Sequence, residues 1–272
     1  MKKLTVLFFL CIIPFIANAT ISEMSFGKWN IKFDDETKRA EFVKEGVTVL
    51  KDVKIKFKNG DVLLDASSYN SVKIKQEDIV DEVGKARKFT IEYTGSENSD
   101  NPIVYQNFYL YDGQDYFLTD VILQSPDNSI ISSNYIAPIS TEADNLFLPA
   151  DVNNRFITVP FDNDGFITYA SYPLSCSQTD PESLAIGRVA RDSVSMEVSA
   201  IFNGETQLGL VIGSVDHDTW KSAVRITGSP LAQGKITNLE CFSGVTHHIT
   251  RDMIDGVLKP HGAVKGQQVK SA

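Results

Sequence analysis

Hydrophobic and polar residues alternate along most of this chain, the pattern of strands with one buried and one solvated face. The stretch Val53–Lys58 alternates without a break, with Val, Ile and Phe on one face and lysines on the other. We therefore expect Lys54, Lys56 and Lys58 to lie on the solvated face of a strand. Ser193–Phe202 alternates in the same way, which predicts one strand with Val194, Met196, Val198 and Ala200 on one face and Ser193, Ser195, Glu197 and Ser199 on the other.

Turn dipeptides separate these stretches. Asn59-Gly60 follows the lysine-bearing strand, and Asp112-Gly113 separates Gln106–Tyr111 from Tyr116–Leu123. Both residues of such dipeptides tolerate positive φ, so they favour tight hairpins. Asn203-Gly204 ends the next alternating stretch, before the apolar run Leu208–Ser214.

Short strands separated by turn signals predict an all-β fold, an antiparallel sandwich. Only Gln76–Val83 and Thr250–Val257 have the composition of a helical turn or two. We expect one sandwich domain over residues 20–259. The stretch 260–272 has no hydrophobic period and is rich in Gly, Gln and Lys, which predicts a linker-like tail.

The N-terminus has the three parts of a signal peptide. Lys2 and Lys3 precede the apolar run Leu4–Ile16, and Ala17-Asn18-Ala19 is a small-x-small cleavage site. The run is too short to span about 30 Å of hydrocarbon. We therefore expect cleavage after Ala19 and a periplasmic or extracellular protein. Cys11 follows Leu10 rather than a small residue, which disfavours lipidation.

The charge of the chain argues against polyanionic partners. The formal net charge is −9, and loss of Lys2 and Lys3 makes it −11. Nucleic acid and anionic lipid would be repelled, and no basic cluster offsets this balance. We expect neither a nucleic-acid partner nor a membrane span.

Two cysteines remain after processing, Cys176 and Cys241. In an oxidising compartment they can form a disulfide, worth about 4 kcal/mol in the chain-entropy model. Two separate buried thiols are the alternative, and the sequence does not decide between them. Neither cysteine has the spacing of a zinc or redox motif.

The most distinctive polar stretch is Asp162-Asn163-Asp164-Gly165, flanked by Phe161 and Phe166. Carboxylates and amides beside aromatic rings suit hydroxyl-rich ligands, so Asp162, Asn163 and Asp164 are candidate carbohydrate contacts. An Asx-rich turn is the simpler interpretation. A calcium loop is disfavoured, because Pro160 occupies a ligand position of the EF-hand pattern.

A second candidate stretch is Asp216-His217-Asp218-Thr219-Trp220. A carboxylate beside an imidazole suits acid–base chemistry, but alternate residues of an extended segment point to opposite faces. Trp220 is either a carbohydrate platform or a core residue. His247-His248 diverge in a strand, and His261 lies in the predicted tail. Spacing alone therefore assembles no catalytic set, and we expect no metal and no cofactor.

Three stretches resemble a known family: NLFLPADVNNRFITVPFDNDGF, SVSMEVSAIFNGETQLGLVIGSVDHDTWKSAVRI and HGAVKG. They are similar to the N-terminal domain of secreted alpha-galactosidase-like proteins of Bacteroidetes, near glycoside hydrolase family 36. The resemblance covers most of the mature chain, more specifically after about Asn145.

The resemblance implies a β-supersandwich of galactose mutarotase type that packs on a (β/α)8 barrel. The family's two catalytic aspartates belong to that barrel and have no counterpart here. The leading hypothesis is a non-catalytic N-terminal domain, truncated before the barrel, that works with a catalytic barrel in cis or in trans. Asp162, Asn163, Asp164 and Trp220 would contact galactoside-type carbohydrate. The alternatives are a free-standing carbohydrate-binding module and a mutarotase-like epimerase.

Overall fold

The chain folds almost entirely into antiparallel strands, which confirms the predicted all-β sandwich. The computed structural model describes residues 20–142, 147–159, 170–174, 192–216, 221–228, 234–245 and 263–271. Within these residues the structure has strands β1 to β20 and one short 3-10 helix, Ala66–Ser68, whose first turn is capped by Asp65.

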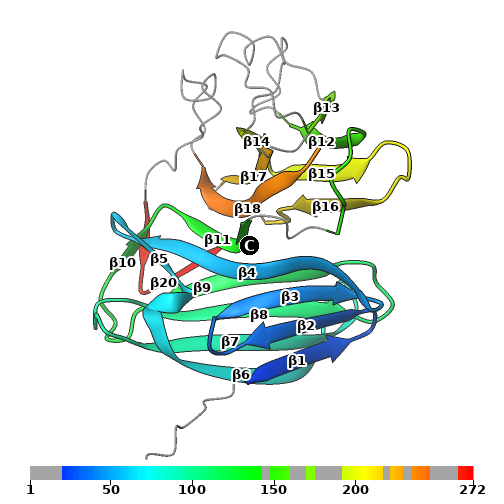
Figure 1. The fold of residues 1–272 in the computed structure, drawn as a ribbon. Helices are drawn as coiled ribbons and strands as arrows, with labels where there is room; N and C mark the ends of the chain where they lie inside the picture. Colours follow the sequence, from blue (N-terminus) through cyan, green and yellow to red (C-terminus); the bar gives the residue numbers. More distant parts are fainter. Residues whose placement is uncertain are drawn as a thin grey trace, which may run out of the picture.

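Four sheets contain the strands (Figure 1). The largest has nine strands, in the order β1 (Ile21–Phe26), β2 (Trp29–Asp34), β3 (Arg39–Lys44), β4 (Val47–Asn59), β11 (Ile136–Glu142), β18 (Ile236–Val245), β17 (Lys221–Gly228) and β14 (Asp192–Met196), with β5 (Val62–Asp65) also paired to β4. A five-stranded sheet has the order β20 (Gln268–Ser271), β9 (Phe117–Gln124), β8 (Ile103–Tyr111), β7 (Lys85–Ser96) and β6 (Tyr69–Val80). A four-stranded sheet has the order β13 (Ala170–Pro173), β12 (Asn154–Thr158), β15 (Val198–Asn203) and β16 (Gly209–Gly213), and a two-stranded sheet joins β10 (Ile131–Ser133) to β19 (Val264–Gly266).

Strands β1 to β4 cover one side of the five-stranded sheet and form the larger sandwich (Figure 1). Aromatic rings from the two layers meet edge to face in its core. The ring centroids of Phe42 and Phe108 lie 5.8 Å apart, and those of Phe33 and Tyr93 lie 6.1 Å apart. Such pairs add about 0.5–1.5 kcal/mol to the burial of the rings themselves.

The nine-stranded sheet extends beyond this sandwich and packs on the four-stranded sheet (Figure 1). Val224 and Ile226 of β17 are buried in the same hydrophobic cluster as Phe156 of β12 and Ile201 of β15. One sheet is therefore shared by two packed layers, and its middle strand β11 is buried along nearly its whole length.

The predicted hairpins are confirmed where the structure describes them. Asn59 and Val62 close the turn between β4 and β5, with Gly60 at φ 60°. Gly113 has a φ of 71° in the turn between β8 and β9. These left-handed conformations are the reason for glycine at both positions.

The prediction of one continuous strand over Ser193–Phe202 is wrong. The chain breaks at Glu197, which has a φ of 61°, and leaves β14 in the nine-stranded sheet for β15 in the four-stranded sheet. One left-handed residue reverses the faces that follow it. Val198 is therefore 39% exposed, whereas Ser199 is buried and donates a hydrogen bond to the carbonyl of Ile157 at 2.7 Å.

The expected helical turn over Gln76–Val83 is also absent, since Gln76–Val80 continue β6. Cross-strand ion pairs override the helical composition, because Lys88 lies 3.0 Å from Glu77 and Arg87 lies 2.7 Å from Asp78. The carboxylate of Asp81 then accepts hydrogen bonds from the backbone of the next turn. The second expected helix, Thr250–Val257, lies outside the described residues.

The interpretation of 260–272 as a linker is wrong for the residues that the structure describes. Val264–Gly266 pair with β10, and Gln268–Ser271 pair with β9 as the edge of the five-stranded sheet. Val269 is 2% exposed and lies opposite Leu123. The sequence of the tail resembles that of a linker because only alternate residues of this short edge strand are buried, so few apolar residues are needed.

We expect Val269→Ala to lower the free energy of unfolding by about 2 kcal/mol, because it removes two buried carbon atoms and leaves a cavity. Lys265→Ala in the neighbouring β19 is the control, since its side chain is exposed. Urea denaturation of both variants measures the difference. Equal stabilities would show that the segment does not pack as a strand in solution.

Candidate functional site

The outer side of the five-stranded sheet carries a group of polar and aromatic side chains, here called the polar–aromatic face: Tyr105, Asn107, Tyr109, Asp120 and Lys270. The first three are alternate residues of β8, so they share the face opposite the core residue Phe108. The register places Asp120 of β9 beside Asn107.

A row of hydrogen bonds crosses this face. Thr90 donates to the amide oxygen of Asn107 at 2.7 Å, and the Asn107 nitrogen donates to Asp120 Oδ1 at 2.6 Å. The second oxygen of Asp120 accepts from the Tyr109 hydroxyl at 2.9 Å and pairs with Lys270 Nζ at 3.2 Å. Asp120 thus has three donors, which satisfies a carboxylate that is only 4% exposed.

Two tyrosines give the face an aromatic surface. Tyr105 and Tyr109 are both partly exposed and lie four residues apart on one strand, a separation of about 14 Å. Burial, with the negative charge of Asp120, raises the pKa of Tyr109, so its hydroxyl stays protonated at physiological pH. The arrangement offers rings for an apolar sugar face and protonated groups beside them for hydroxyls.

The charged residues around the face are paired. Lys75 donates to Glu92 at 2.6 Å, and Lys88 pairs with Glu77 and lies 5.9 Å above the ring centre of Tyr109. With opposite charges neutralising one another, the surroundings suit a neutral ligand better than a polyanion.

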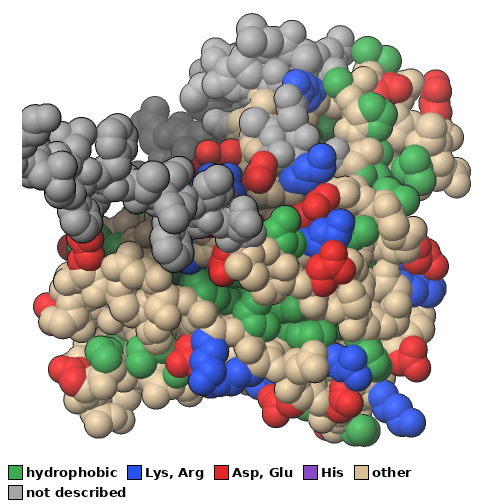
Figure 2. Space-filling view, turned by 60° about the horizontal axis from the view of Figure 1, so that its bottom comes forward, with side chains coloured by type: hydrophobic (Ala, Val, Ile, Leu, Met, Phe, Trp, Pro, Cys, Tyr) green, Lys and Arg blue, Asp and Glu red, His purple; other side chains and the backbone are tan. Residues whose placement is uncertain are grey.

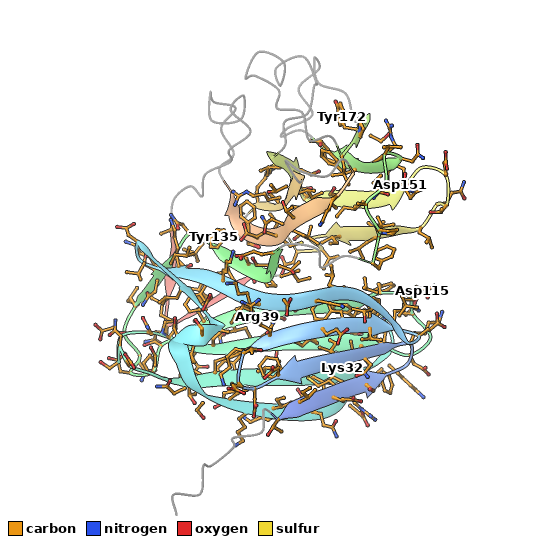
Figure 3. All side chains as sticks on the ribbon, viewed as in Figure 1. Lys32, Arg39, Asp115, Tyr135, Asp151 and Tyr172 are labelled. Atoms are coloured by element: carbon orange, nitrogen blue, oxygen red, sulfur yellow. The ribbon has the colours of Figure 1, made fainter. Side chains whose placement is uncertain are left out.

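A second cluster of charges lies on the nine-stranded sheet, around Glu240 of β18. Three groups contact the Glu240 carboxylate. The Arg225 guanidinium of β17 lies 2.9 Å from it, the Lys56 ammonium of β4 lies 3.5 Å from it, and the Ser140 hydroxyl of β11 donates to it at 3.4 Å. Tyr135 also hydrogen-bonds to Glu240 and lies where the larger sandwich meets β11 and β18 (Figure 3). Burial and the charge of Glu240 raise the pKa of Tyr135.

This cluster corrects the prediction of a solvated lysine face. The Lys54 and Lys56 side chains are only 18% and 19% exposed. Lys54 pairs with Asp65 at 3.2 Å, and Lys56 with Glu142 at 3.5 Å as well as with Glu240. The reason is that β4 is an interior strand, and β11 and β18 bring carboxylates to its outer side. The Glu240 carboxylate is fully engaged by its neighbours, which favours a structural role.

The residues predicted to contact carbohydrate, Asp162, Asn163, Asp164 and Trp220, all lie outside the described residues, as do His217, His247, His248 and His261. Their flanking backbone does converge. The Met196 N–H donates to the carbonyl of Val159 at 2.8 Å, and the Glu197 N–H donates to that of Ser222 at 2.9 Å. Val159 and Ser222, which lie beside the two candidate stretches in the sequence, therefore bond to adjacent residues at the bend between β14 and β15.

The predicted disulfide stays a prediction. Cys241 carries a free thiol in the structure and packs partly buried against the core, and Cys176 lies outside the described residues. Burial and the nearby charge of Glu240 raise the pKa of Cys241, so a free thiol at this position stays protonated at neutral pH.

Within the described ranges, no group of three His, Cys, Asp or Glu side chains is arranged to hold a metal ion. In the same ranges, no helix is long and apolar enough to cross a membrane.

The polar–aromatic face was missed by the sequence analysis. The signal was present in the spacing of Tyr105, Asn107 and Tyr109, which puts three polar or aromatic residues on one face of β8. Asp120 gave a second signal, because it is the one charged residue of the strand FLTDVILQ.

Comparisons with known proteins bear on the fold. No family model matches the sequence, and a search of curated proteins finds no match. The fold is similar to that of the alpha-N-acetylgalactosaminidase NagBb from Bifidobacterium bifidum. The TM-score is 0.57 at 10% identity for its Gal-NHAc-DNJ complex and 0.50 at 11% identity for its GalNAc complex.

Both matches cover 92% of this chain but only 36% of the NagBb chain. The chain therefore shares its β-sandwich fold with a part of a glycosidase and spans about a third of that protein's length.

We expect Asp120→Ala to lower the free energy of unfolding by about 2–3 kcal/mol, because it leaves the Asn107 amide and the Tyr109 hydroxyl without an acceptor. Asp115→Ala is the matched control. Asp115 precedes the same strand, but it is 66% exposed and pairs with Lys28 and Lys44 at the end of the sandwich (Figure 3). Its loss should cost much less, since exposed ion pairs contribute little. Urea denaturation measures the free energy of unfolding of both variants. Equal losses would contradict the role of Asp120 as the acceptor of this hydrogen-bond network.

Proposed function

We propose that this chain is a non-catalytic β-sandwich domain of a secreted, alpha-galactosidase-like glycoside hydrolase, and that it contributes carbohydrate binding rather than bond cleavage. The observation that carries the proposal is the match of nearly the whole chain to about a third of a glycosidase. Hydrolysis would then belong to a (β/α)8 barrel domain that associates in cis or in trans.

The chemistry of the described residues supports a role without catalysis. Glycoside hydrolysis uses two carboxyl groups that flank the bond, about 5–10 Å apart, and at least one must be able to exchange a proton with substrate. The two most buried carboxylates, Asp120 and Glu240, are instead saturated by donors from their own sheets. Both carboxylates link neighbouring strands and so stabilise the sheets. This structural role favours an accessory domain.

The polar–aromatic face supports the carbohydrate part of the proposal. The Tyr109 side chain is held by Asp120 of β9 and Lys88 of β7, so little of its entropy is lost when a ligand binds. Their separation exceeds the width of one sugar ring, which favours an oligosaccharide. The predicted contacts Asp162, Asn163, Asp164 and Trp220 remain part of the carbohydrate-binding hypothesis.

Export is part of the same proposal. The N-terminal pattern of residues 1–19 predicts cleavage after Ala19 and a periplasmic or extracellular location. In that location the protein would have access to carbohydrates that are too large to cross the membrane.

A free-standing carbohydrate-binding module is the second candidate. The polar–aromatic face favours it as well, because binding at this face needs no residue from another domain. The two candidates differ in whether a barrel domain associates with the chain.

Hydrolysis assays test the absence of catalysis. We expect the chain from Thr20 onward to release no nitrophenol from p-nitrophenyl α-galactoside or α-N-acetylgalactosaminide above a buffer blank. An α-galactosidase run in parallel is the positive control. Sustained turnover that persists through repeated purification would contradict a non-catalytic domain.

Isothermal titration calorimetry with galactose, N-acetylgalactosamine and α-galacto-oligosaccharides tests the binding face. We expect binding of an oligosaccharide that Tyr105→Ala weakens about fivefold, because an aromatic contact is worth about 0.5–1.5 kcal/mol. Tyr116→Ala is the control, since Tyr116 is 44% exposed but lies outside the face. Unchanged affinity in Tyr105→Ala would remove this face from the proposal, and no heat with any sugar would remove carbohydrate binding.

A further inference from the structure

Strand β16 forms an open edge of the four-stranded sheet. It pairs with β15 on one side, and within the part of the chain that the structure describes no strand pairs with its other side. Its residues Gly209, Val211 and Gly213 are exposed, and Val211 is 72% exposed. Figure 2 shows hydrophobic side chains gathered at the upper right, on the side where Figure 1 places β15 and β16.

This edge lacks the usual protection against strand pairing. Edge strands are commonly guarded by a charged residue, a proline or a bulge. The segment Leu208–Val215 contains no charged residue and no proline, and its pairing with β15 is regular from Val198 to Phe202. Leu208 and Val215 at its two ends are 56% and 71% exposed.

The hydrogen bonds to β15 fix which backbone groups face the open side. The Asn203 N–H donates to the carbonyl of Leu208 at 2.9 Å, and the Ser214 N–H donates to that of Glu197 at 2.8 Å. In an antiparallel ladder, alternate residues of a strand point their N–H and C=O groups to the same neighbour. Leu208, Leu210, Ile212 and Ser214 therefore bond to β15, and the groups of Gly209, Val211 and Gly213 point outward.

The sequence of the strand, Gly-Leu-Val-Ile-Gly, is nearly symmetric about Val211. In an antiparallel pair of two copies centred on this residue, Val211 lies opposite Val211, Gly209 opposite Gly213, and Leu210 opposite Ile212. The outward-facing groups then meet one another, because Val211 and both glycines are the residues that face the edge. About six backbone hydrogen bonds form in this register.

The side chains fit the same register. Gly209 and Gly213 leave room for Phe202 and Val198 of β15, since a Cβ on them would lie 2.9 Å and 3.1 Å from those side chains. With glycine opposite glycine across the two-fold axis, Val198 and Phe202 of each copy border an apolar surface centred on the two Val211 side chains. Asp216 would face Thr206 of the other copy, so no like charges meet.

We propose that two copies of this chain associate through β16, in an antiparallel pair centred on Val211 that joins their four-stranded sheets into one. The interaction is isologous, as two-fold symmetry requires. A pair of short edge strands buries less surface than a standard interface, so we expect association at about 10–100 µM. This proposal is independent of the carbohydrate-related function.

Sedimentation velocity on the chain from Thr20 onward tests the association. We expect a concentration-dependent shift toward twice the monomer mass, and a monomer at all concentrations for Val211→Lys, because two lysines would meet at the axis. Circular dichroism checks that the variant retains its strands. A monomeric wild-type chain up to several hundred µM would overturn the proposal.

A cysteine pair tests the register with a milder change. Paired residues on a two-fold axis have Cα atoms about 5.5 Å apart, within reach of a disulfide. Val211→Cys should therefore give a covalent dimer on oxidation. Val215→Cys is the matched control, being equally exposed, because in this register Val215 lies opposite Gln207 and the two introduced thiols are too far apart. Two outcomes would show a different interface and overturn the proposal. One is equal cross-linking of both variants, and the other is no cross-linking of Val211→Cys although the chain dimerises.

Discussion

The burial of both faces of β11 is the constraint on which the rest of the structure depends. One face of the nine-stranded sheet packs on the main hydrophobic core, and the other is covered around Tyr135 and Phe242. Polar groups on such a strand and its neighbours cannot reach bulk water, so they must find partners in the protein. Ser140 and Glu240 meet this requirement together with Lys56 and Arg225. The ion cluster thus lies on the face of the sheet that carries Tyr135 and Phe242, opposite the main core, and satisfies the polar groups that are buried there.

Much of the fold follows from local pattern. The alternation at Val53–Lys58 and the Asn59-Gly60 signal correctly predicted the strand β4, its buried face and the hairpin that follows, because a period of two and a turn are local properties. Sequence does not reveal what covers the polar side of a strand, and so the lysines of β4 were expected to be solvated. Glu197 illustrates a different limit. Nothing in its neighbourhood signals a left-handed residue, yet this one angle sends the chain into another sheet and reverses which residues are exposed.

The candidate site was less predictable than the fold. Tyr105, Asn107 and Tyr109 share a face by simple alternation, but their importance depends on Asp120 and Lys270, which come from β9 and β20. Only the register brings these residues together, and sequence reasoning placed Lys270 in a linker. The stretches with the most distinctive composition, around Asp162 and Trp220, lie outside the described residues, although Val159 and Ser222 beside them bond to the adjacent residues Met196 and Glu197. Their role remains the interpretation drawn from their chemistry.

The pairing of β20 with β9 also has a consequence for how the chain folds. Val121 and Ser271 are neighbours in the sheet but are 150 residues apart in the sequence. Ribosomal synthesis makes β9 long before its partner exists, so the edge of the five-stranded sheet stays uncovered during that interval. Contacts of such long range slow folding and prolong the exposure of unpaired strands. In a chain that folds only after it has crossed a membrane, β9 and β20 become available within a short time of each other. The edge of the sheet would then stay uncovered for a shorter time than during ribosomal synthesis.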